Sequence, residues 1–160
     1  MDALIPIAER IAEILKARRQ TVAVAESSSG GLVSAALLAI PGASAYYQGG
    51  AVVYTGRARM QLMQLTREDV EGVRSASEPY ALILARAARD NFKTTWGISE
   101  TGAAGPGGNA YGDASGHTCI AIAGPDIEMA LTVETGSDDR VANMYAFAEG
   151  ALELLERSLA

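Results

Sequence analysis

The sequence contains only one cysteine and one histidine in 160 residues. The lone cysteine, Cys119, excludes an intrachain disulfide, and its apolar surroundings at 118–122 favour a buried structural thiol over a nucleophile. A Ser-His-Asp triad would have to use His117, for which we expect a structural or binding role rather than a catalytic one. Because cysteine and histidine form no cluster, we expect neither a metal nor a cofactor.

Basic residues and long apolar runs are also scarce. There are 13 lysines and arginines against 19 acidic residues, giving a net charge of −6. Nucleic-acid binders neutralise phosphates with a basic surface, so we expect no nucleic-acid partner, although one small basic pocket remains compatible with the net charge. No apolar run approaches the roughly 20 residues of a membrane-spanning helix. The N-terminus has no basic signal-peptide start, so we expect no membrane partner and a cytoplasmic location.

The residues that are present suit a packed core, because 49% are hydrophobic and 20% are charged. At this length we expect one domain spanning 1–160. Helical periodicity predicts helices at about 5–19, 32–40, 57–64, 78–92 and 137–159, and short apolar runs predict strands at about 21–25, 49–55, 95–100, 117–123 and 128–135. The alternation, followed by two consecutive strands and a closing helix, predicts an α/β fold: a three-layer α/β/α sandwich with a mixed, mostly parallel sheet.

A turn rich in serine and glycine, Glu-Ser-Ser-Ser-Gly-Gly at 26–31, joins the first expected strand to a helix. Ligands of open α/β sheets bind at the carboxyl ends of the strands, and the free N–H groups of a helix N-terminus suit an anion. The serines of this turn could cap the helix, donate to a ligand or attack one. Capping alone explains the pattern about equally well.

Two further segments follow expected strands. The stretch 100–109 is too rich in glycine for a simple hairpin, and it begins a loop of the length that is often functional, so we expect it to wrap a small ligand. At 54–59 a tyrosine ends a strand and Arg57 and Arg59 follow. Arginine stays protonated and suits phosphate or carboxylate, but an exposed helix start explains these residues as well.

Taken in order, these segments resemble the C-terminal domain of the competence/damage-inducible CinA proteins, the nicotinamide-nucleotide amidase family. Residues 25–31 resemble the family pattern A-E-S-C-T-G-G, with serine replacing cysteine and threonine. Residues 101–106 match T-G-I-A-G-P, residues 50–55 resemble G-x-V-x-Y-S, and Ser77-Glu78 matches an S-E pair at a helix start. The resemblance covers nearly the whole chain, which would be a stand-alone, divergent member.

The resemblance implies hydrolysis of the carboxamide of nicotinamide mononucleotide to nicotinate mononucleotide and ammonia. It implies that Ser27 is the nucleophile, that Tyr54 assists it, and that Arg59 stands where the family has a lysine. A lysine can lose its proton and act as a base, whereas an arginine cannot. Three functions therefore stay open: an amidohydrolase, a nucleotide-binding module with impaired chemistry, and a hydrolase of another small amide or ester, with Asp113 and His117 reshaping the pocket.

The resemblance also implies a small-molecule partner, a pyridine nucleotide, and a homo-oligomer. Arg59 or Arg140 would hold the phosphate, and Gly102 with neighbouring N–H groups would stabilise an oxyanion. The residues expected to contact the substrate are Glu26, Ser28, Ser29, Gly30, Gly31, Thr101, Gly102, Gly105 and Arg140.

Overall fold

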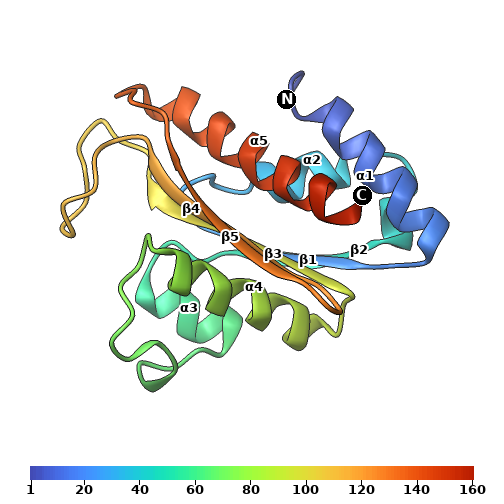
Figure 1. Cartoon of the computed structure of the whole chain (residues 1–160), viewed down its shortest axis with the longest axis horizontal. Helices are drawn as coiled ribbons and strands as arrows, with labels where there is room; N and C mark the ends of the chain where they lie inside the picture. Colours follow the sequence, from blue (N-terminus) through green and yellow to red (C-terminus); the bar gives the residue numbers. More distant parts are fainter.

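The computed structural model describes the whole chain, Met1–Ala160, and contains the five helices and five strands that the sequence predicts (Figure 1). In chain order the elements are α1 (Ile5–Arg18), β1 (Val22–Glu26), α2 (Leu32–Leu38), β2 (Tyr47–Val52), α3 (Gly56–Met63), α4 (Glu78–Phe92), β3 (Trp96–Ala103), β4 (His117–Ala123), β5 (Glu128–Glu134) and α5 (Arg140–Leu159). Two short 3₁₀ turns lie at Ala43–Ala45 and Glu68–Val70.

The five strands form one mixed sheet in the order β2-β1-β3-β4-β5. β1 pairs in parallel with β2 and β3, whereas β4 pairs antiparallel with β3 and β5. Helices α1, α2 and α5 cover one face of the sheet, and α3 and α4 cover the other (Figure 1). The predicted three-layer α/β/α sandwich is confirmed, with its parallel part confined to β2, β1 and β3.

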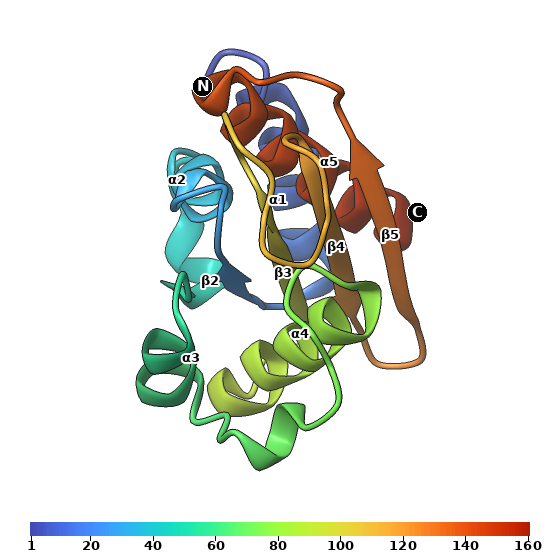
Figure 2. The same ribbon diagram turned by 90° about the vertical axis from the view of Figure 1, so that its left-hand side faces the viewer.

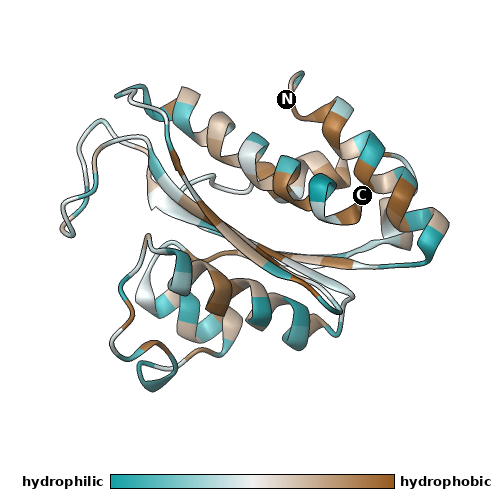
Figure 3. Ribbon diagram, in the orientation of Figure 1, coloured by the Kyte–Doolittle hydropathy of each residue, from teal (hydrophilic) through white to brown (hydrophobic).

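The core lies on both faces of the sheet because both faces carry helices. Every residue of β1 and β4 is buried, as expected for central strands between two helical layers. On one face Ile11 of α1 and Leu152 of α5 pack with Ile120 of β4, and hydrophobic segments recur along these elements (Figure 3). Each such fully buried side chain contributes about 1.5–3 kcal/mol to folding. This rigid core fixes the positions of the strand ends.

The parallel strands place their carboxyl ends at one edge of the sheet. β1 ends at Glu26 and β2 at Val52, and β3 runs to Ala103 in the same direction. Figure 2 looks at this edge, with the loop 104–116 in front of the sheet. The sequence places the start of this loop too early: Thr101 and Gly102 belong to β3, because they pair with Cys119 and Thr118 of β4.

Candidate active site

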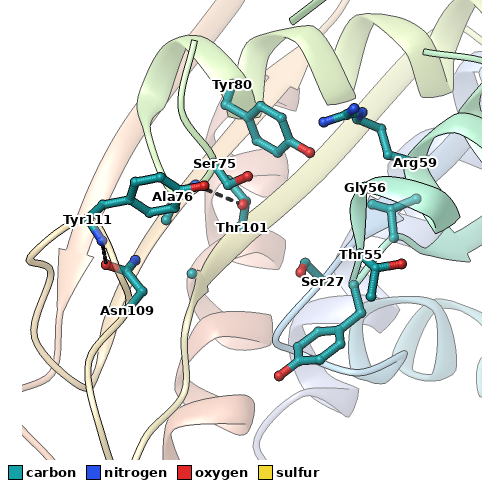
Figure 4. A pocket seen from close by; sticks show the side chains of 13 residues that line it. Ser27, Thr55, Gly56, Arg59, Ser75, Ala76, Tyr80, Thr101, Asn109 and Tyr111 are labelled. Carbon is teal, nitrogen blue, oxygen red and sulfur yellow. Dashed lines mark hydrogen bonds between the residues drawn. The ribbon is translucent and has the colours of Figure 1, made fainter. Parts of the chain in front are cut away.

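A pocket of about 390 Å³ opens at this edge of the sheet (Figure 4). Its walls come from the end of β1, the segment after β2, α3, the start of α4 with the residues before it, the end of β3 and the loop 104–116. The lining residues are Ser27, Val53, Tyr54, Thr55, Gly56, Arg59, Ser75, Ala76, Tyr80, Thr101, Gly102, Asn109 and Tyr111. The pocket therefore joins the three segments that the sequence singles out.

The three expected catalytic residues, Ser27, Tyr54 and Arg59, all line this pocket. Ser27 directly follows β1, and Arg59 is carried by α3. Helix α3 begins at its N-cap Thr55, whose hydroxyl accepts a hydrogen bond from Ala58 N (3.1 Å). Figure 4 shows Ser27 and Arg59 in the same pocket, with Thr55 and Gly56 between them. The structure thus brings together residues that are up to 32 positions apart in the chain, from 27 to 59.

The conformation of the serine turn depends on two fully buried carboxylates. Glu26 caps the start of α2: it accepts hydrogen bonds from Ser29 Oγ (2.7 Å), Gly31 N (2.8 Å), Val33 N (3.1 Å) and Ser34 N (2.9 Å). These bonds satisfy the free N–H groups of the first turn, and the negative charge complements the helix dipole. Glu26 therefore serves the frame of the turn and does not line the pocket.

Glu100 of β3 is the second carboxylate, and it holds the turn from the neighbouring strand. It accepts from Ser27 N (3.1 Å), Ser29 N (2.8 Å), Ser28 Oγ (2.5 Å) and Thr118 Oγ1 (2.7 Å). The hydroxyls of Ser28 and Ser29 are thus used inside the frame, and Ser27 is the serine that lines the pocket. Sequence reasoning missed this role of Glu100, although an acidic residue at the end of an apolar strand is the signal that could have indicated it.

The other expected substrate contacts divide between the pocket and its frame. Thr101 and Gly102 line the pocket. Gly30 and Gly31 have φ of +69° and +99°, and a Cβ on Gly30 would lie 2.7 Å from Met144 Cε. These glycines permit the turn and its packing on α5. The expected contacts that lie outside the lining are Glu26, Ser28, Ser29, Gly30, Gly31, Gly105 and Arg140.

The two candidate phosphate-binding arginines differ in what they contact. Arg140 donates from Nη1 to the carbonyl oxygen of Gly105 (2.5 Å) and from Nη2 to the hydroxyl of Tyr54 (3.3 Å). Arg59 has a buried Nε without a hydrogen-bond partner. A buried donor without a partner costs about 1–3 kcal/mol, and more when it belongs to a charged group. Because Arg59 lines the pocket and Arg140 does not, Arg59 is the arginine that can reach an anion there.

No carboxylate, lysine or histidine lines the pocket. The only histidine, His117, is buried elsewhere: its Nε2 lies 2.8 Å from the carbonyl oxygen of Ala76, and its Nδ1 contacts Glu134. Burial alone would lower the pKa of His117, but the bonds to Glu134 and Ala76 and the nearby carboxylates outweigh it and raise the pKa. Both ring nitrogens face acceptors, which suits the doubly protonated ring and a structural role.

Cys119 and Asp139 also have structural roles. Cys119 is buried, as predicted, and burial raises the pKa of its thiol, which disfavours the nucleophilic thiolate. Asp139 is the N-cap of α5 and accepts from Ala142 N (3.0 Å). No group of three or more histidine, cysteine or acidic side chains is placed to hold a metal ion. No helix is long and apolar enough to cross a bilayer.

Several pocket residues gave no signal in the sequence. Tyr80 is in the first turn of α4, three residues after the N-cap Ser77, whose hydroxyl accepts from Tyr80 N (3.3 Å). Its position there is typical of a core residue. Ala76 N donates to Thr101 Oγ1 (3.1 Å) and so fixes the segment before α4 against β3. Tyr80 and Ala76 reach the pocket through packing between segments that are distant in the sequence, and no local motif marks them.

Comparison with known proteins identifies the family to which the chain belongs. Residues 4–159 match the family model of the CinA C-terminal domain. A CinA-like protein of Chlorobium limicola is 34% identical over 148 residues, 90% of this chain and 34% of that protein. A CinA-like protein of Gloeothece citriformis is 36% identical over 151 residues, 93% of this chain and 36% of that protein.

Solved structures give the same result. The competence/damage inducible protein CihA from Agrobacterium tumefaciens superposes with a TM-score of 0.90 at 28% identity, covering 98% of this chain and 95% of that one. A competence or damage-inducible protein from Enterobacter asburiae gives 0.91 at 26% identity, covering 98% of both chains. The fold is thus that of the CinA superfamily, and the chain belongs to the CinA C-terminal domain family. It spans about a third of the length of the two curated relatives.

Proposed function

We propose that this pocket binds a pyridine mononucleotide, nicotinamide mononucleotide, and that Ser27 attacks its carboxamide in a slow amidohydrolase reaction. The observation that carries the proposal is that Arg59, whose buried Nε has no hydrogen-bond partner, lines the same pocket as Ser27. A cation suits the phosphate of the nucleotide, and a serine that lines the same pocket suits the carboxamide. The volume of about 390 Å³ lies within the range of small-molecule sites.

The proposed reaction follows the usual course of acyl transfer. Ser27 Oγ attacks the carboxamide carbon and loses its proton, the C–N bond breaks, and the amine leaves as ammonia after gaining a proton. Water then attacks the acyl-serine, which releases nicotinate mononucleotide and restores the hydroxyl. Each step needs a group that carries a proton, and general acid–base catalysis is worth about 10²–10⁴-fold.

The slow rate in this proposal follows from the residue at position 59. The guanidinium of Arg59 stays protonated and cannot accept the proton of Ser27. No carboxylate, lysine or histidine lines the pocket, so none of these groups can accept the proton in place of Arg59. Arginine at this position does keep the positive charge, and its planar fork suits a phosphate group. Binding is therefore expected to be preserved while turnover is reduced.

A second candidate function is an amidohydrolase of unreduced rate in which Tyr54 carries the proton. The observation in its favour is that Tyr54 lines the pocket with Ser27 and that its hydroxyl is oriented by Arg140 Nη2 at 3.3 Å. A tyrosine can serve as a general acid or base when it lies within reach of the reacting group. The two candidates differ in what a lysine at position 59 would do to the rate.

The test combines calorimetric titration of the purified protein with nicotinamide mononucleotide and measurement of ammonia release. We expect saturable binding and slow ammonia release, with Ser27→Ala losing the release and keeping the binding. Arg59→Gln should weaken binding. No binding to the wild-type protein, or equal ammonia release from wild type and Ser27→Ala, would overturn the proposal.

A further inference from the structure

The loop 104–116 contributes one large aromatic side chain to the pocket. Tyr111 lines the pocket and is 52% exposed, whereas Tyr80 on the same wall is 5% exposed. Tyr80 is thus a core residue with one edge at the pocket, and Tyr111 is a ring presented to solvent. Tyr111 is therefore an aromatic side chain that lines the pocket and remains accessible to a ligand.

Tyr111 is presented by a short turn that is closed by Asn109. The amide oxygen Oδ1 of Asn109 accepts from Tyr111 N (3.0 Å) and from Asp113 N (3.1 Å). The amide nitrogen Nδ2 of Asn109 donates to Asp113 Oδ2 (2.7 Å). Two of these bonds hold the backbone at Tyr111 and Asp113, and the third holds the carboxylate of Asp113.

A second contact ties this turn to the segment before α4. Arg74 binds Asp113 with both ends of its guanidinium, Nη1 to Oδ2 at 2.6 Å and Nη2 to Oδ1 at 3.1 Å. The guanidinium carbon of Arg74 also lies 5.4 Å from the centre of the Tyr111 ring, within the distance of a cation–π contact. The hydrogen bonds from Arg74 lower the pKa of Asp113, which favours the charged carboxylate that this pair requires.

These contacts place the ring before a ligand arrives. A preorganised aromatic side chain loses little conformational entropy on binding, which increases the net gain from each contact. Figure 4 shows Tyr111 and Arg59 on opposite sides of the pocket, with Ser27 below and between them. The pocket therefore has an aromatic wall at one end and an unpaired cation at the other.

We propose that Tyr111 is a specificity-determining residue on which the planar ring of the bound nucleotide stacks while Arg59 binds the phosphate. This inference rests on the proposed function and adds to it the group that selects the ring. Stacking of one base on an aromatic side chain is worth about 1–3 kcal/mol, or about 5–150-fold in affinity. Ligands that carry the phosphate and sugar without a ring should gain none of this affinity.

The experiment titrates the full chain with two ligands, nicotinamide mononucleotide and ribose 5-phosphate, which lacks the ring. Tyr111→Ala should weaken binding of the mononucleotide by about 5–150-fold and leave the affinity for ribose 5-phosphate within about twofold. Tyr111→Phe is the matched control, because it keeps the ring and loses only the hydroxyl, and it should bind both ligands as the wild type does. Arg59→Gln should weaken the binding of both ligands.

The two ligands also separate the possible failures. Tyr111→Ala could lose as much affinity for ribose 5-phosphate as for the mononucleotide. That result would show a general disturbance of the pocket and would overturn the stacking role. Unchanged mononucleotide affinity in Tyr111→Ala would overturn it as well. If the wild type binds neither ligand, the proposed function itself fails. If it binds both equally, the phosphate site stands and the stacking role fails.

Discussion

Arg59→Lys changes the one side chain on which the proposed slow turnover depends. The Nε of Arg59 is buried without a hydrogen-bond partner, so the substitution removes no hydrogen bond of that atom within the protein. Lysine replaces the guanidinium with an amine, which can release its proton when it is desolvated and then accept that of Ser27. General-base catalysis is worth about 10²–10⁴-fold, so kcat for ammonia release should rise by that factor.

The assay follows ammonia release from nicotinamide mononucleotide at saturating substrate and over a range of pH. In Arg59→Lys the rate should rise with pH as the lysine loses its proton, and the wild type should lack this limb. Arg59→Gln is the control without charge or base, and its rate should not rise. The variant Ser27→Ala/Arg59→Lys should be inactive. An Arg59→Lys rate equal to that of the wild type would refute the reasoning and would favour Tyr54 as the proton carrier.

The remaining predictions concern the frame of the site. Glu100→Gln should destabilise the fold by about 1–3 kcal/mol in urea unfolding, because the amide cannot accept from all the donors that the carboxylate binds; unchanged stability would contradict this role. Gly30→Ala should lower the thermal midpoint, because φ is +69° there and residues with a Cβ rarely adopt that conformation; an unchanged midpoint would contradict it. Folding raises the pKa of His117 above its usual 6.5, so its contact with Glu134 stabilises the fold fully below about pH 6.5 and loses this effect as the pH rises through the folded-state pKa. The stability difference between wild type and His117→Gln should therefore shrink as the pH rises above about 6.5, and a constant difference would contradict the assignment.

The fold could be predicted from the sequence because its signals are local. Helical spacing of apolar residues marks α1 and α5, and buried apolar runs mark β1 and β4. The predicted bounds of the strands are less accurate at the ends, where the chain leaves the sheet. The strand expected at 49–55 lies at Tyr47–Val52, because Thr55 leaves the strand to cap α3. Likewise β3 continues to Ala103 because β4 pairs with it.

The candidate site could be predicted only in part, because its motifs are local and its contacts are not. The serine turn and the T-G-A-A-G-P stretch mark Ser27, Thr101 and Gly102, which line the pocket. The bond of Glu100 to Thr118 spans 18 residues, and the bond of Arg74 to Asp113 spans 39. Such partners follow from strand order and loop packing, which no single segment encodes. The expected self-association remains a prediction that size-exclusion chromatography can check.

The most direct test of the central claim is one calorimetric titration of the wild-type protein with nicotinamide mononucleotide, with ammonia measured in the same sample. The claim is that Arg59 keeps a nucleotide site and slows its chemistry. It predicts saturable binding at one site per chain, weakened by Arg59→Gln, with ammonia release that is slow compared with that of Arg59→Lys. Absence of binding, or binding that Arg59→Gln leaves unchanged, would contradict it.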